Sequence, residues 1–136
     1  MSSITFKSSL IKGLIAGLAS AFINSILYYA FKNLGAINDI VQIKAETTLG
    51  VHHAIISSIV SSVIASFVFF VISLFARDAF RIFQRISLIL LILSFFNPFL
   101  FIPDVPVGFA ISLNIMHIVV AAAVMYVMKK HIPFLQ

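Results

Sequence analysis

Four long apolar runs without a single Asp, Glu, Lys or Arg dominate the 136-residue sequence. They cover residues 13–31, 54–76, 86–103 and 105–128. An α-helix needs about 20 mostly apolar residues to cross the roughly 30 Å hydrocarbon core of a bilayer, whereas a membrane β-strand needs only about 10 of alternating polarity. The runs have the helical length and do not alternate. The sequence therefore predicts an all-α integral membrane protein with four transmembrane helices.

The composition excludes an ordinary soluble domain. Hydrophobic residues make up 62% of the chain and charged residues only 10%, whereas a soluble domain carries about 25% charged residues. A water-soluble fold of this length cannot bury so much apolar side chain. The absence of cysteine excludes disulfides and thiolate metal sites. We expect a single transmembrane domain over residues 1–136, with helices at about 10–31, 52–76, 82–102 and 105–129.

Two of the runs carry further signals. The first begins near residue 10 and lacks a small-residue cleavage site before a polar region, so we interpret it as a retained helix, not a removed signal peptide. The third contains the pair Asn97-Pro98, and proline inside a helix removes a hydrogen bond and clashes with the preceding turn. We expect the third helix to bend or end there.

Basic residues gather on one side of the predicted spans. Lys32 and Lys44 lie in the first connection, and the other Lys and Arg lie in the N-terminal segment, the second connection or the C-terminal segment. This second group consists of Lys7, Lys12, Arg77, Arg81, Arg85, Lys129 and Lys130. Basic residues stay on the cytoplasmic side. The pattern predicts an up-down-up-down four-helix bundle with the N-terminus and the C-terminus both cytoplasmic.

The two longer connections have patterns of their own. In the first, Ile37, Ile40, Val41 and Lys44 recur at helical spacing, which favours a short interfacial helix. In the second, three arginines step by four and share a helical face, where they can contact lipid phosphates. These are Arg77, Arg81 and Arg85. Simple topology signalling is the preferred interpretation of the arginines.

Small and polar side chains lie in stripes on the predicted helices, and in lipid such residues mark the faces that pack together. On the first helix the stripe consists of Gly13, Gly17, Ser20 and Asn24. On the second it consists of Ser57, Ser58, Ser61, Ser62, Ser66 and Ser73. We expect these faces to contact protein, and the opposite Phe, Ile and Val faces to contact lipid.

Five polar residues fall within about one helical turn of the mid-membrane plane when depth is counted at about 1.5 Å per residue. They are Asn24, Ser66, Ser94, Asn114 and His117. An unpaired polar group in hydrocarbon costs several kcal/mol, so we expect this midplane cluster to satisfy its own hydrogen bonds. His117 can relay protons, ligate haem or a metal, or contact a ligand. A structural histidine bonded to Asn24 or a serine is the preferred interpretation.

A second candidate cluster lies at the outer face and consists of His52, His53, Asn97 and Asp104. The histidine pair can bind a surface metal, but an interfacial polar cap at the start of the second helix is preferred, so no metal site is predicted. We expect His131, in the C-terminal tail, to be solvated only. The sequence has no Gly-rich phosphate loop, nucleophile elbow or paired carboxylates, so no catalytic residue is predicted.

The segments Phe80-Arg81, Ser94-Phe95-Phe96-Asn97-Pro98 and Met116-His117 resemble a family of small four-helix bacterial integral membrane proteins of unknown function. The resemblance covers most of the chain. It implies a four-span architecture in a bacterial cytoplasmic membrane and no particular activity. It also directs attention to Met116-His117 and to the Asn97-Pro98 turn.

Three functional hypotheses follow. The leading one is a bundle that acts by association, as a homo-oligomer or as an accessory subunit of a membrane complex, because small-residue faces are abundant and catalytic groups are absent. The second is a small-solute or ion pathway formed by an oligomer. The third is lipid, quinone or haem binding at the outer half, near His52, His53, Asn97 and Asp104. Membrane lipids and the chain itself or another membrane protein are the expected partners; no nucleic acid, no cofactor and no catalysis are expected.

Overall fold

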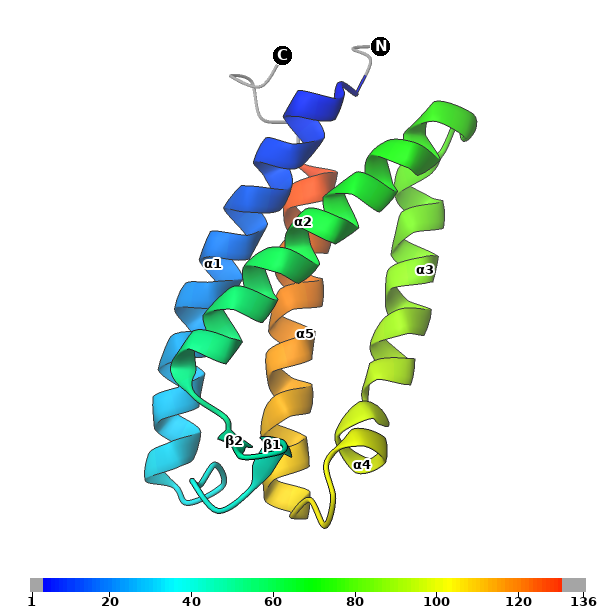
Figure 1. Ribbon diagram of the computed structural model, residues 1–136. Coiled ribbons are helices and arrows are strands. Elements are labelled where there is room, and N and C mark those ends of the chain that lie inside the picture. The colour runs from blue at the N-terminus through cyan, green and yellow to red at the C-terminus, as the bar shows by residue number, and fades with distance from the viewer. Residues whose placement is uncertain (1–3, 131–136) are drawn as a thin grey trace.

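The computed structural model describes residues 4–130 and is mainly helical (Figure 1). Its elements are α1 (Phe6–Asn33), β1 (Gln42–Lys44), β2 (Thr47–Thr48), α2 (Val51–Phe75), α3 (Ala79–Ser94), α4 (Asn97–Phe101) and α5 (Val107–Lys129). Three helices, α1, α2 and α5, are long and apolar enough to cross a membrane. The structure therefore supports the prediction of a helical membrane protein.

Residues 82–102, expected as one helix, form two helices in the structure. The first of them, α3, ends at Ser94, and Pro98 stands in the first turn of α4. Continuing α3 would drive the Pro98 ring into the carbonyl group of Ser94, four residues earlier. The predicted break at the Asn97-Pro98 pair is thus confirmed, and it leaves α3 with 16 residues. That length is about 24 Å, short of the roughly 30 Å of hydrocarbon.

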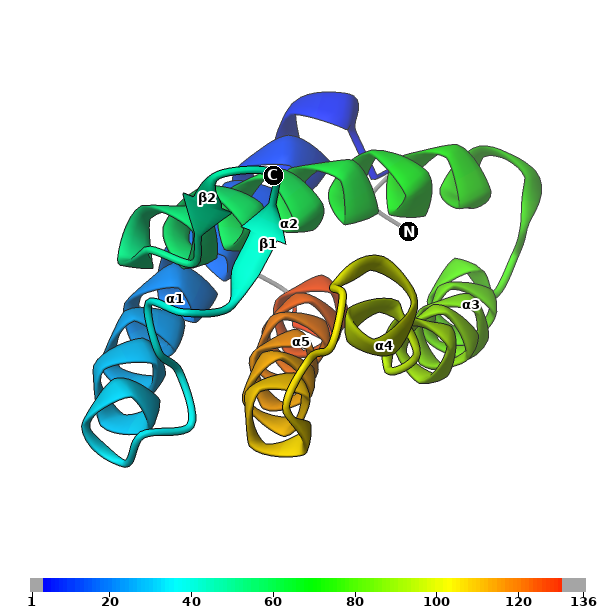
Figure 2. The ribbon, with the colours of Figure 1, turned by 60° about the horizontal axis from the view of Figure 1, so that its bottom comes forward.

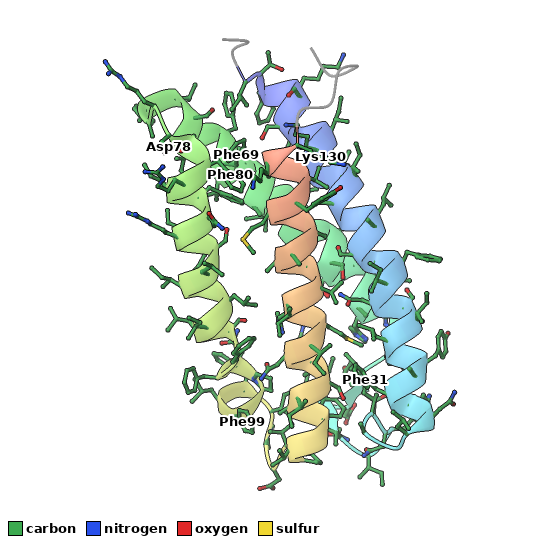
Figure 3. All side chains as sticks on the ribbon, turned by 180° about the vertical axis from the view of Figure 1, so that it is seen from behind. Phe31, Phe69, Asp78, Phe80, Phe99 and Lys130 are labelled. Atoms are coloured by element: carbon green, nitrogen blue, oxygen red, sulfur yellow. The ribbon has the colours of Figure 1, made fainter. Side chains whose placement is uncertain are left out.

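The helices run alternately up and down, so their termini gather at two ends (Figure 1). The first turn of α1, the α2–α3 connection and the last turn of α5 lie together, and Lys12 Nζ donates a hydrogen bond to the Lys130 carbonyl oxygen at 2.8 Å. We call this the basic end. The β1–β2 hairpin and α4 lie at the opposite end, here called the hairpin end. Figure 3 shows the same division from behind, with Asp78 and Lys130 at the basic end and Phe31 and Phe99 at the hairpin end.

The prediction of an interfacial helix between α1 and α2 is wrong, because this segment forms the antiparallel β1–β2 hairpin. Asn38 redirects the chain before β1: its Oδ1 accepts hydrogen bonds from the backbone N–H groups of Ile40 at 3.0 Å and Val41 at 3.1 Å. Such a side-chain-to-backbone turn competes with helix formation. Glu46 makes the turn in the left-handed region, at φ 57°. Ile37 is buried and anchors the segment to the bundle.

Two apolar clusters hold the bundle together, one near each end. The basic-end cluster consists of Ala16, Phe69, Ala79, Phe83, Val124, Val127 and Met128. The hairpin-end cluster consists of Tyr28, Ile37, Leu49, Ala54, Ile102, Phe109 and Met116. The only buried residues of α3 are Ala79 and Phe83, both in its first turns. The α3–α4 segment is therefore fixed at its two ends, through Phe83 and Ile102, and packs loosely between them.

Candidate functional site

A cleft of about 740 Å³ lies between α2, α3 and α5, in the middle of the bundle between the two apolar clusters. In Figure 2, α2 runs along one side of the bundle, while α3 and α5 lie on the other. The lining is mostly apolar. Its polar members are Asn24, His53, Ser57, Ser58, Ser61, Ser87, Ser94 and His117. The cleft thus combines an apolar wall with a small set of hydrogen-bonding groups, as small-molecule sites do.

The cleft opens through the side of the bundle. Its lining residues Ile56, Val60 and Leu90 are 58%, 48% and 59% exposed. Val60 lies near the middle of α2, while Ile56 and Leu90 lie just over one turn inside α2 and α3. In a membrane this side faces hydrocarbon, so the opening leads to the bilayer interior.

Asn24 joins three helices beside the cleft. Its Nδ2 group donates to Ser58 Oγ at 3.0 Å and to the Met116 carbonyl oxygen at 3.3 Å, so α1, α2 and α5 meet at one side chain. The Ser58 hydroxyl itself donates to the Ala54 carbonyl oxygen at 2.6 Å, which leaves its oxygen free to accept. Interhelical bonds of this kind contribute about 0.6 kcal/mol each on average in a membrane protein. Asn24 therefore fixes the relative rotation of the three long helices.

His117 lines the cleft from α5. Its Nδ1 atom lies 2.8 Å from the Leu113 carbonyl oxygen. A carbonyl oxygen only accepts, so in this contact Nδ1 carries the proton and the neutral ring presents Nε2 as an acceptor. Within residues 4–130, His117 makes no hydrogen bond to Asn24 or to a serine. The expected bond to Asn24 or a serine is therefore not formed, and a structural role for His117 stays a prediction.

The structure separates the predicted midplane cluster into three places. Asn24, Ser94 and His117 line the cleft, although no two of them are hydrogen-bonded to each other. Ser66 instead lies between α1 and α2, where a Cβ atom on Gly13 would meet its side chain. Asn114 Nδ2 donates at 3.2 Å to the Phe95 carbonyl oxygen, a group that the break after α3 leaves without its helical partner.

Ser58 is the partner of Asn24 that the midplane prediction missed. The midplane prediction used depth along each helix, and depth placed Ser66 closer to the middle of α2. The signal that identifies Ser58 is its place in the serine stripe, since Ser58, Ser62 and Ser66 recur every four residues and are all buried in the structure. Ser57 and Ser61, from the same stripe, line the cleft.

The predicted outer-face cluster does not form one site. His53 Nδ1 accepts a hydrogen bond from the Gly50 backbone N–H at 3.0 Å, and the rings of His52 and His53 lie 4.0 Å apart between centroids. This arrangement supports the interpretation as a cap at the start of α2. Asp104 lines a separate hollow beside Asn38, and neither Asn97 nor Asp104 lines the cleft. Among residues 4–130 no three His, Asp or Glu side chains are grouped to hold a metal ion.

The three arginines are exposed at the basic end. Arg81 Nε lies 3.1 Å from Asp78 Oδ2, in a solvated pair three residues apart. Such exposed pairs add little to stability. Contact of Arg77, Arg81 and Arg85 with lipid phosphates stays a prediction. His131 lies outside the residues that the structure describes.

No curated protein and no solved structure matches this chain. A family model, described as a family of unknown function (DUF6069), matches residues 5–132. The match includes every helix and strand of the structure, the cleft and His117. It confirms the resemblance to a family without an assigned activity. The chain belongs to the DUF6069 family, a family of unknown function.

Proposed function

We propose that this protein is a four-span membrane protein that holds a lipophilic small molecule, taken from the bilayer, in the cleft between α2, α3 and α5. The observation that carries the proposal is the cleft itself, which measures about 740 Å³ and opens sideways toward lipid. Small-molecule sites range over about 300–1,000 Å³ and have mostly apolar linings. The third functional hypothesis also had lipid or quinone binding, but at the outer-face residues His52, His53, Asn97 and Asp104, of which only His53 lines this cleft.

The size of the cleft favours a small molecule over a helix from a partner. A spanning helix about 30 Å long and about 10 Å in diameter fills roughly 2,400 Å³. The cleft holds about 740 Å³, close to a third of that volume. A partner helix would therefore stay mostly outside it, whereas a single lipophilic molecule fits within it.

The small-residue faces were the main argument for association with a second copy or with a larger complex, and the structure gives them another role. Ala16, Gly17 and Ser20 are buried, and a Cβ atom on Gly17 would stand 3.0 Å from the Ile59 Cα atom of α2. The small-residue faces thus have a role within the chain, in the close approach of α1 and α2. They no longer argue for a partner, and association stays an untested hypothesis.

A solute or ion pathway through one chain also has little support. At the basic end an apolar cluster stands between the cleft and the aqueous face, whereas at the hairpin end the lining reaches Ile43 and His53. The lateral opening leads to hydrocarbon, where an ion is not stable. Binding from the membrane interior agrees better with this geometry than conduction across it. Because His117 is the one ionisable group near mid-depth among residues 4–130, we propose binding without catalysis.

The four-span topology with both ends cytoplasmic belongs to this proposal. Since α2 ends at the basic end and α5 begins at the hairpin end, the chain between them has to cover the thickness of the bundle (Figure 1). The helix α3 alone covers about 24 Å at the usual rise, and α4 continues the segment toward the hairpin end, so together they approach the thickness of the hydrocarbon core. The excess of Lys and Arg at the basic end supports a cytoplasmic location of that end. The resemblance suggests a bacterial cytoplasmic membrane.

The topology is tested by cysteine labelling, because the chain contains no cysteine. Lys44→Cys, Arg77→Cys and Lys129→Cys each place one thiol at an exposed position. We expect a membrane-impermeant maleimide to label Lys44→Cys on intact cells, and the other two variants only after permeabilisation. Labelling of Arg77→Cys and Lys129→Cys from opposite sides would show that α3 and α4 do not cross the membrane, and the proposal would fail.

Ligand retention is tested by filling the cleft. Ala121 lines the cleft, while the next residue, Ala122, is exposed and lies outside the lining. We expect native mass spectrometry from mild detergent to detect a bound small molecule in wild type and in Ala122→Phe. In Ala121→Phe the affinity for this molecule should fall roughly tenfold, a loss of about 1.4 kcal/mol in binding free energy. Equal retention by the two variants, or a wild-type protein that is bare in every mild detergent, contradicts the proposal.

A further inference from the structure

We propose that the molecule held in the cleft is a neutral alcohol or phenol whose hydroxyl group donates a hydrogen bond to Nε2 of His117. This inference rests on the proposed function and names the chemical class of the ligand. Two observations support it: the hydrogen-bonding groups of the cleft near His117, and the absence of charged side chains among the described residues that line the cleft.

The His117 ring has one proton and one lone pair to offer. The Nδ1 proton is directed to the Leu113 carbonyl oxygen at 2.8 Å. Nε2 has no hydrogen-bond partner in the part of the chain that the structure describes. The side chain is exposed at the cleft, and in a bilayer, where no water replaces the missing partner, an acceptor without a donor costs several kcal/mol. The histidine therefore favours a ligand that brings a donor to this point.

The neighbouring polar groups do not supply that donor. The amide protons of Asn24 are directed to Ser58 Oγ and the Met116 carbonyl oxygen. The hydroxyl groups of Ser58 and Ser94 donate within their own helices, to Ala54 and Leu91 carbonyl oxygens at 2.6 Å. The polar protons of Asn24, Ser58 and Ser94 are thus already used in hydrogen bonds within the protein. An ether, ester or ketone, which can only accept, gains nothing from Nε2.

A hydroxyl group fits because it donates and accepts at once. While its proton binds Nε2, its lone pairs can accept from a serine hydroxyl. Ser61 of α2 and Ser87 of α3 line the same cleft. The rest of the ligand would lie against apolar walls such as Val120 and Leu91.

The charges argue against an ionic head group in the cleft. Of the described residues that line it, none is Lys, Arg, Asp or Glu. The transfer of an unpaired phosphate or carboxylate into hydrocarbon costs several kcal/mol or more. A phospholipid can place its acyl chains in the opening, but its phosphate has no counter-charge there. The occupant is therefore neutral.

A matched pair of probes tests the inference on the full-length protein in mild detergent. The probes are 4-nonylphenol, which has a hydroxyl donor, and 4-nonylanisole, its methyl ether, which has none. We expect wild type to bind the phenol about tenfold more tightly than the ether, the effect of one net hydrogen bond. In protein labelled with ¹⁵N-histidine, the phenol and not the ether should shift the Nε2 resonance of His117.

Variants separate the hydrogen bond from shape. His117→Leu should bind both probes equally, while His117→Gln, which keeps an acceptor, should recover most of the preference for the phenol. His52→Leu, an exposed histidine outside the cleft lining, should behave as wild type. Because His117 bonds only within α5 among the described residues, His117→Leu should fold. If His117→Leu does not fold, the ¹⁵N shift of His117 in wild type still tests the inference.

The outcomes distinguish the inference from the proposed function. If wild type binds both probes equally and Ala121→Phe loses both, a ligand occupies the cleft but its hydroxyl group is irrelevant, and the inference alone is overturned. A preference for the phenol that persists in His117→Leu overturns it as well. If neither probe binds and Ala121→Phe resembles Ala122→Phe, the cleft holds no small molecule, and both proposals are overturned.

Discussion

Gly17→Ala is expected to lower the free energy of unfolding by about 1–3 kcal/mol, the usual cost of an added methyl group in a filled contact. The new Cβ atom would lie 3.0 Å from the Ile59 Cα atom and 3.4 Å from the Ile59 carbonyl oxygen. These are backbone atoms of α2 and cannot rotate away. The two longest helices would have to separate, although alanine improves the helix propensity of α1 by about 1 kcal/mol.

Gly108→Ala is the matched control, because it makes the same chemical change near the start of α5. Its nearest neighbour would be the Ala36 Cβ atom at 4.0 Å, an ordinary van der Waals contact. We expect no loss of stability there, and up to about 1 kcal/mol of gain. SDS titration in mixed micelles, followed by circular dichroism, measures both variants. If Gly17→Ala is as stable as Gly108→Ala, the α1–α2 contact is looser than the structure describes.

Phe83→Ala is expected to cost about 2–3 kcal/mol of stability and to release the basic end of α3. Phe83 is 2% exposed, and its ring meets that of Phe69 edge-on at 5.3 Å between centroids. In lipid the transfer of an apolar side chain contributes little. The cost then comes from the cavity, at about 24 cal/mol per Å³ for roughly 100 Å³ of lost side chain.

Phe75→Ala serves as the control for Phe83→Ala. Phe75 lies at the same end of the bundle but is 86% exposed, so its removal should change stability by less than about 0.5 kcal/mol. Hydrogen exchange adds a local readout: amides of α3 should exchange faster in Phe83→Ala, while those of α1 should not change before global unfolding. Equal losses in the two variants would mean that α3 is not anchored through Phe83.

The long helices were predictable because length and apolar composition alone decide which segments can cross a bilayer. The helix break was predictable because proline acts on its own preceding turn, whatever surrounds it. The hairpin was not. The spacing of Ile37, Ile40 and Val41 fits a helix, and only the hydrogen bonds of Asn38 to the backbone show that the chain turns there instead.

The cleft could not be predicted from the sequence. Leu90 and Leu91 on α3 have the same apolar character whether they face lipid, a neighbouring helix or an open space. Counting residues gives depth but not rotation, so the midplane prediction included Ser66, which lies against α1, and omitted Ser58, which binds Asn24. The cleft exists because the α3–α4 segment is fixed only near its two ends, and this tertiary property has no local signal in the sequence.

The attachment of α3 and α4 at opposite ends has a kinetic consequence. Phe83 holds the segment at the basic end and Ile102 holds it at the hairpin end, while the stretch between them has no buried residue other than Pro98. We expect that stretch to bend away from the bundle more easily than its two attached ends. The small molecule proposed for the cleft would then enter or leave without release of Phe83 or Ile102. Its exchange rate will then follow the fluidity of the surrounding acyl chains more closely than the unfolding rate of the protein.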